Sequence, residues 1–73
     1  MADFECRLKE YRRLKGLTQL QLAQQVGTHR DVIGLLERGR RKPSPRLALA
    51  ISQAVDVPIE KIFIFPQNNP RSS

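Results

Sequence analysis

The chain consists of short apolar stripes at helical spacing, and a glycine or a proline stops nearly every one of them. The breaks fall at Gly16, Gly27, Gly39, Pro43 and Pro58. Glycine readily adopts the left-handed conformation that ends a helix, and proline cannot continue a helix interior. The sequence therefore predicts short helices joined by tight turns. Since mostly local contacts suit a chain of 73 residues, this pattern indicates a compact all-α domain.

The expected elements are five helices followed by a short apolar C-terminal extension. The helices cover about 3–15, 18–27, 30–38, 45–55 and 58–62. Thr18 with Gln21 forms a capping-box pattern, and Ser44 before Pro45 combines an N-cap residue with a first-turn proline. Residues 62–65 have high strand propensity and stop at Pro66. We expect one domain over 1–66 and a flexible tail over 67–73.

The net charge of +6 is concentrated in one part of the chain. Residues 30–46 carry six Lys or Arg against two acidic residues, whereas 16–29 carry no charge and 47–73 are balanced. A basic excess this local indicates a polyanionic partner such as nucleic acid.

The composition argues against an enzyme, a metal site and a membrane span. The chain has no room for a second core, holds one cysteine, Cys6, and one histidine, and offers neither a paired nucleophile and base nor a glycine-rich phosphate loop. We therefore expect no catalytic residue, cofactor, metal or small-molecule effector, and Cys6 is interpreted as a small apolar filler. With no signal-peptide features and no stretch near the ~20 apolar residues of a membrane span, a cytoplasmic location is expected.

Two of the expected helices flank Gly27 in the layout of a helix-turn-helix. Ala23 lies where the two helices approach each other and must be small, while Gly27 gives the turn its backbone freedom. Four apolar residues face the core side of the pair, namely Leu22, Val26, Ile33 and Leu36. The basic run at 40–42 follows directly after the second helix, as expected for a DNA reader.

These features and others along the chain resemble the Cro/cI-type (XRE) helix-turn-helix family of bacterial and phage regulators. The most specific matches are the Lys15-Gly16-Leu17-Thr18-Gln19 entry to the motif and its Glu37-Arg38-Gly39 exit. The other matching positions are Leu8, Lys9, Arg12, Leu22, Ala23, Gly27, Ile33, Arg41, Pro43, Ser44, Leu49, Ala50, Val57 and 59–63. The resemblance covers about 6–65. It implies a lambda-repressor-like five-helix fold, sequence-specific binding to double-stranded DNA and homodimers on two-fold symmetric operators.

Carried onto this sequence, the motif occupies 19–38 and its reading helix starts near His29. Base contacts are expected from the outward face of that helix, at Arg30, Asp31, Gly34 and Leu35. Phosphate contacts are expected from Gln19, Thr28, His29, Arg38, Arg40, Arg41, Lys42, Arg12 and Lys15. Phosphate contacts orient the protein without carrying a direct sequence code.

Arg30 is the strongest base-contact candidate, because a guanidinium can donate two hydrogen bonds to guanine, worth about 1–3 kcal/mol of discrimination. Leu35 fits either a thymine methyl or packing on a neighbouring loop. Asp31 either accepts from a cytosine amino group or stabilises the helix start. Gly34 would bring the helix closer to the groove floor.

Two further expectations concern the ends of the motif. Either Thr28 or His29 caps the reading helix. Glu37 is expected to pair structurally with an arginine, because a carboxylate facing phosphates would be unfavourable.

The C-terminal segment is unusually apolar, and its role has two interpretations. Five large apolar residues, Ile59, Ile62, Phe63, Ile64 and Phe65, fall within seven positions. They either cover the core or form a dimer seam, and we favour the seam. The favoured function is a transcriptional repressor that binds as a homodimer. The alternative is an antitoxin or adaptor module that grips protein, whereas RNA binding is disfavoured by the lack of exposed aromatics.

Overall fold

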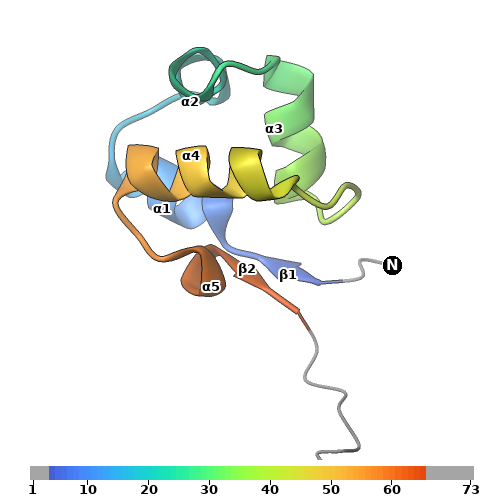
Figure 1. Ribbon diagram of the computed structural model, residues 1–73. Coiled ribbons are helices and arrows are strands. Elements are labelled where there is room, and N and C mark those ends of the chain that lie inside the picture. The colour runs from blue at the N-terminus through green and yellow to red at the C-terminus, as the bar shows by residue number, and fades with distance from the viewer. Residues whose placement is uncertain (1–3, 66–73) are drawn as a thin grey trace, which may run out of the picture.

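The computed structural model describes residues 4–65, which form five helices and a two-stranded sheet (Figure 1). The elements in chain order are β1 (Glu5–Cys6), α1 (Leu8–Leu14), α2 (Gln19–Val26), α3 (Arg30–Glu37), α4 (Pro45–Val55), α5 (Ile59–Ile62) and β2 (Phe63–Ile64). The expected five-helix architecture is confirmed, and a small two-stranded sheet is added to the all-α fold that the sequence predicts. The expected tail at 67–73 and the stop at Pro66 lie outside the described residues. Within 4–65, no helix is long and apolar enough to cross a membrane.

The residues that cap and terminate the two helices of the helix-turn-helix are those that the sequence predicts. Thr18 Oγ1 accepts a hydrogen bond from the Gln21 amide at 3.0 Å, and Gln21 Oε1 accepts one from the Thr18 amide at 2.9 Å. Gly27, with φ of 75°, and Gly39, with φ of 71°, take the left-handed conformation after α2 and α3. Because an L side chain is strained there, glycine at these two positions fixes the turn and the exit of α3.

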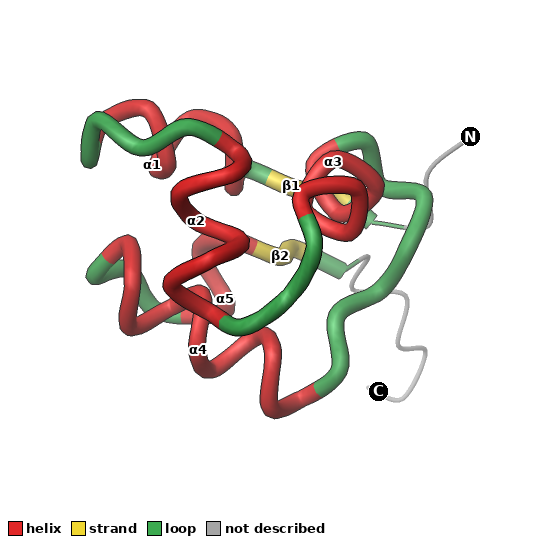
Figure 2. Tube along the Cα trace, turned by 90° about the horizontal axis from the view of Figure 1, so that it is seen from above, coloured by secondary structure: helices red, strands yellow, loops and turns green. Residues whose placement is uncertain are grey.

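The core lies where α2 and α3 pack against α4 and α1. Figure 2 shows the molecule from above, with α3 nearly end-on beside α2. The expected core side of the motif is confirmed, since Leu22, Ala23, Ile33 and Leu36 are buried and Val26 packs against them. The remaining buried apolar residues are Phe4, Leu8, Ala48, Ile51, Val55, Ile62 and Phe63. With its apolar side committed to this core, α3 presents its opposite side outward.

The expectation of a first helix from residue 3 is wrong, because the chain is extended up to Cys6. Glu5 pairs with Ile64 and Cys6 with Phe63 in an antiparallel sheet, and the Arg7 amide donates to the Ile62 carbonyl at 2.8 Å. Phe4 is buried, with its ring centroid 6.2 Å from that of Phe63. The backbone N–H and C=O groups at the start of the chain therefore find their hydrogen-bond partners in the C-terminal strand, and not within a longer first helix.

Candidate nucleic-acid interface

A shallow hollow on the outward side of α3 gathers six of the residues expected to contact DNA. Gln19 from α2 and Arg30, Asp31, Gly34, Leu35 and Arg38 from α3 and its C-terminal end line it. We call this set the α3 hollow. All four expected base-contact positions are among its members. The fold therefore brings these side chains together on one surface, opposite the core face of α3.

Residues at the two ends of α3 keep their charges exposed. Arg30 and Asp31 occupy the first turn and are exposed, and Arg38 is the exposed C-cap residue. Leu35 is half-buried. This degree of exposure is compatible both with a contact to a thymine methyl and with packing on a neighbouring loop. Asp31 lies in the first turn, where a carboxylate interacts favourably with the helix dipole, and it also lines the α3 hollow, so both of its interpretations remain predictions.

Gly34, expected to let the helix approach the groove floor, has two long side chains lying close to it. It is buried, and a Cβ placed on it would lie 3.6 Å from Arg38 Nη1 and 3.8 Å from Gln19 Nε2. Two polar side chains thus converge over the backbone at this position. The helix can approach a groove floor at Gly34 only after these side chains move or themselves enter the groove.

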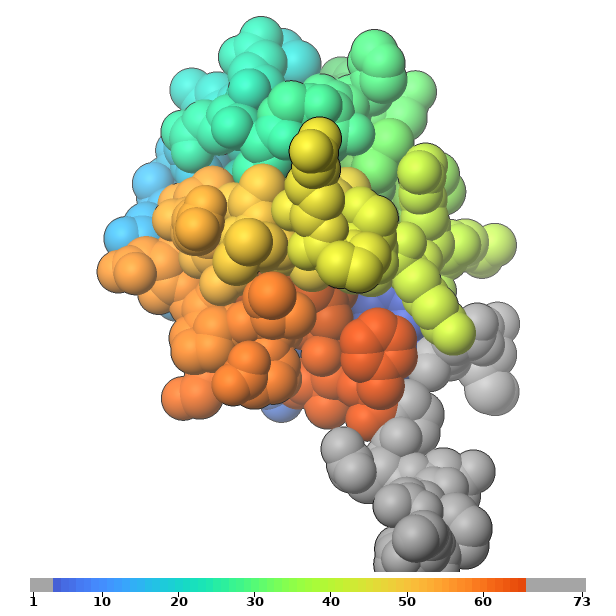
Figure 3. All heavy atoms as spheres, viewed as in Figure 1, coloured from blue at the N-terminus to red at the C-terminus, as the bar shows by residue number. Residues whose placement is uncertain are grey.

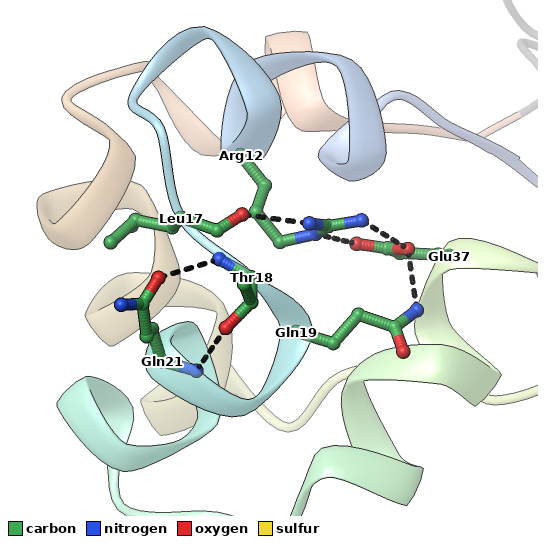
Figure 4. Close-up of polar contacts among 6 residues, drawn as sticks. All are labelled: Arg12, Leu17, Thr18, Gln19, Gln21 and Glu37. Carbon is green, nitrogen blue, oxygen red and sulfur yellow. Dashed lines mark hydrogen bonds and ion pairs between the residues drawn. The ribbon is translucent and has the colours of Figure 1, made fainter.

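Arg12 is buried in an ion pair, so its expected role as a phosphate contact is wrong (Figure 4). Its Nε donates to Glu37 Oε2 at 2.6 Å and its Nη1 donates to the Leu17 carbonyl at 2.7 Å. The two side chains are only 8% and 4% exposed. The expectation that Glu37 pairs with an arginine is confirmed, and the arginine is on α1.

The same carboxylate also holds the first residue of α2. Gln19 Nε2 donates to Glu37 Oε1 at 2.9 Å, and Arg12 Nη2 donates to the same oxygen at 3.3 Å (Figure 4). Glu37 therefore joins α1, α2 and α3 in one polar network. Because Gln19 lines the α3 hollow, this network fixes one wall of it.

Four further residues expected to contact phosphate are exposed cations that form no ion pair within the described residues. The ion pairs within residues 4–65 are Arg7 with Glu5 and Arg12 with Glu37. The expected phosphate contacts Lys15, Arg40, Arg41 and Lys42 are all exposed and belong to neither pair. An unpaired, exposed group of this kind gives a positive surface potential that attracts polyanions.

The turn before α3 presents two smaller polar groups. His29 is the exposed N-cap residue of α3, and its side chain makes no capping hydrogen bond. Thr28 is half-buried, and its amide donates to the Ala23 carbonyl at 2.9 Å. The start of α3 at Arg30 thus agrees with His29 as the cap position, although its imidazole does not supply the cap.

Two basic residues that sequence reasoning missed lie beside Arg30. A second hollow is lined by Lys9, Arg13 and Arg30 together with residues 16–20 and Arg12. Lys9 and Arg13 are four residues apart on α1 and therefore share one helix face. This spacing of four residues on α1 was the signal available in the sequence.

The apolar C-terminal residues divide between core and surface. Ile62 and Phe63 are 0% and 2% exposed, so their assignment to a dimer seam is wrong, because the core already surrounds them. Ile59 and Ile64 are half-buried and Phe65 is 43% exposed, with its ring centroid 5.1 Å from that of Phe4. Figure 3 shows the face on which α4, α5 and β2 form one continuous surface.

The chain is similar to known proteins in both sequence and structure. A family model described as helix-turn-helix matches residues 8–62. An uncharacterized HTH-type transcriptional regulator from Archaeoglobus fulgidus is 44% identical over 59 residues, which cover 81% of this chain and 84% of that protein. The uncharacterized HTH-type transcriptional regulator YgzD from Bacillus subtilis is 33% identical over 63 residues, covering 86% of this chain and 96% of YgzD.

Two solved structures are similar in fold and in sequence. The restriction-modification controller protein C.AhdI from Aeromonas hydrophila has a TM-score of 0.69 and 38% identity, covering 75% of this chain and 80% of its own. SinR, a master regulator for biofilm formation whose structure was solved in complex with DNA, has a TM-score of 0.68 and 29% identity. That match covers 74% of this chain and 87% of the SinR chain.

Proposed function

Since the chain belongs to the XRE-type helix-turn-helix family of transcriptional regulators, we propose that it binds a specific double-stranded DNA operator as a homodimer and represses transcription there. The observation that carries the proposal is the α3 hollow, in which Gln19, Arg30 and Arg38 converge on the outward side of the motif's second helix. A helix of this kind fits the major groove, where base edges present a distinct pattern of donors and acceptors.

Base reading starts at the first turn of α3. Arg30 is exposed and forms no ion pair with another residue of 4–65, so its guanidinium donors are available to the O6 and N7 acceptors of guanine. Asp31, beside it, matches the amino group of cytosine, and Leu35 matches the methyl of thymine. In this proposal the first turn of α3 sets most of the sequence preference.

Phosphate contacts flank the reading helix on both sides. Gln19, Thr28 and His29 lie at the start of α2 and of α3, while Arg40, Arg41 and Lys42 follow α3. Lys15, and with it Lys9 and Arg13, would extend the contact along the DNA backbone from α1. Each neutralised phosphate adds about 0.9 to the slope of log affinity against log salt concentration on duplex DNA.

The homodimer is proposed to form through the surface residues of the C-terminal segment. Ile59, Ile64 and Phe65 remain partly exposed after the core is complete. Residues 47–73 have balanced charge, so two copies meet there without the repulsion that the basic α3 side would create. In such a dimer the two reading helices would lie about 34–36 Å apart, one turn of DNA.

Selection of bound sites from random duplex DNA, followed by affinity titrations, tests the DNA function. The proposal expects a two-fold symmetric consensus. It also expects Arg30→Ala to lose preference at particular base positions, by roughly 5- to 150-fold for a bidentate arginine contact. Equal binding to all sequences would contradict sequence-specific regulation and would favour a protein-interaction module.

Sedimentation of the parent protein and of Phe65→Glu tests the dimer. We expect a dimer for the parent and a monomer for the variant, because a carboxylate would be buried in the seam. Leu14→Glu is the matched control, since Leu14 is 79% exposed on α1 and lies outside the proposed seam. An unchanged mass for Phe65→Glu would contradict this seam.

A reporter assay tests repression. With the selected site placed over a promoter, the proposal expects expression to fall as the protein is induced, because the bound dimer would exclude polymerase. Arg30→Ala should restore expression. An increase in expression with the parent protein would contradict the repressor role while leaving DNA binding intact.

A further inference from the structure

We propose that Arg38 reads a base edge from the middle of α3, in place of the phosphate contact expected from its position at the end of the helix. This inference rests on the proposed function, because it assigns Arg38 a role within the same DNA-reading surface. It makes Arg38 a second specificity-determining arginine beside Arg30.

The guanidinium of Arg38 lies one turn behind its own Cα. Its Nη1 is 3.6 Å from the position that a Cβ on Gly34 would occupy, and both residues line the α3 hollow. Helical side chains lean toward the N-terminus of their helix, so a long side chain at the C-cap reaches back over the preceding turn. The charge of Arg38 therefore sits over the centre of the reading helix.

Glycine at position 34 provides the space for this arrangement. Glycine is a poor helix former, yet it stands in the middle of the eight-residue α3. A large side chain there would occupy the place where Arg38 Nη1 and Gln19 Nε2 converge, at 3.6 and 3.8 Å from the Cβ position. Gln19 is itself held by Glu37 at 2.9 Å, so the opposite wall of this space is fixed.

Acidic neighbours do not neutralise Arg38. Glu37, adjacent in sequence, accepts its hydrogen bonds from Arg12 and Gln19. Asp31 lines the same hollow but forms no ion pair with Arg38 among the residues that the structure describes. The guanidinium thus keeps donors for a bidentate contact with the O6 and N7 acceptors of guanine.

The spacing along α3 predicts where the two arginines read. Arg30 is in the first turn, and the guanidinium of Arg38 lies over residue 34, four residues further on. Four residues of α-helix rise about 6 Å, and successive base pairs are about 3.4 Å apart. We expect the two preferred guanines to lie about two base-pair steps apart in each half-site.

Site selection with the parent, Arg38→Ala, Arg38→Lys and Arg41→Ala separates base reading from phosphate contact. Arg38→Ala should remove the preference at one base position in each half-site, by roughly 5- to 150-fold. Arg38→Lys should lose most of the same preference while keeping the salt dependence, because lysine retains the charge without the bidentate fork. Arg41→Ala, the control, should weaken all sequences alike and reduce the salt slope by about 0.9.

Two results would overturn the proposal. One is an unchanged consensus for Arg38→Ala with a uniform loss of affinity and a salt slope lower by about 0.9, which is the signature of a phosphate contact. The other is a parent protein that enriches no site, which removes the proposed function as well. The first result would leave the proposed function standing, so the two failures are distinguishable.

Discussion

Replacing Glu37 with alanine should remove a large part of the stability of this domain. The carboxylate accepts from Arg12 at 2.6 and 3.3 Å and from Gln19 at 2.9 Å, and its side chain is 4% exposed. Its loss leaves the guanidinium of Arg12 buried without a counter-charge, which costs about 3–5 kcal/mol. A domain of 73 residues has a total free energy of unfolding of about 4–11 kcal/mol.

Thermal and urea denaturation followed by circular dichroism measure this effect. For a domain of this size each kcal/mol lowers Tm by about 4–8 °C, so Glu37→Ala should lower it by roughly 12–40 °C or unfold the protein outright. The control is Glu60→Ala, because Glu60 is exposed in the first turn of α5 and its loss should cost less than about 1 kcal/mol.

A double variant distinguishes a buried charge from a simple loss of packing. Arg12→Met combined with Glu37→Leu removes both charges and should recover most of the stability lost in Glu37→Ala, because an apolar pair avoids desolvating ions. Two outcomes would refute this account of the network. One is a Glu37→Ala protein within 1 kcal/mol of the parent, and the other is a double variant no more stable than the single one.

Three further experiments, two substitutions and one alkylation measurement, test separate parts of the structure. Gly34→Ala should raise the free energy of unfolding by about 0.5–1 kcal/mol, because alanine favours helix and its Cβ would meet Arg38 at an ordinary 3.6 Å; a lower Tm would contradict the contact described. Thr18→Ala should cost about 0.5–2 kcal/mol in urea unfolding through loss of the capping box, and no loss would mean that the cap is dispensable. Burial raises the pKa of the Cys6 thiol, so iodoacetamide should alkylate it more slowly at neutral pH in the folded protein than in urea; equal rates would contradict its half-buried position.

Features that depend on neighbouring residues were predictable from the sequence. The capping box at Thr18, the left-handed Gly27 and Gly39, and the Ser44 cap before Pro45 are all local, and each is present in the structure. Helical spacing of apolar residues also identified the core side of the motif. Local rules suffice here because the residue that ends or caps a helix lies within one turn of what it contacts.

Features that depend on distant contacts were not predictable. The strand at Glu5–Cys6 exists because the C-terminal strand pairs with it, and no periodicity in the first residues signals that partner. The burial of Arg12 requires that α1 pack against the end of α3, where Glu37 lies. The covering of Gly34 depends on how the side chain of Arg38 lies, which the spacing along α3 leaves open.

The central claim is that the outward side of α3 reads DNA, and the structure of the protein bound to its selected duplex tests this most directly. The account predicts α3 in the major groove with Arg30 at a base edge. It also predicts the C-terminal face of α5 and β2 away from the DNA, between two protomers. A complex in which the α3 hollow faces solvent while another surface lies on the duplex would contradict it.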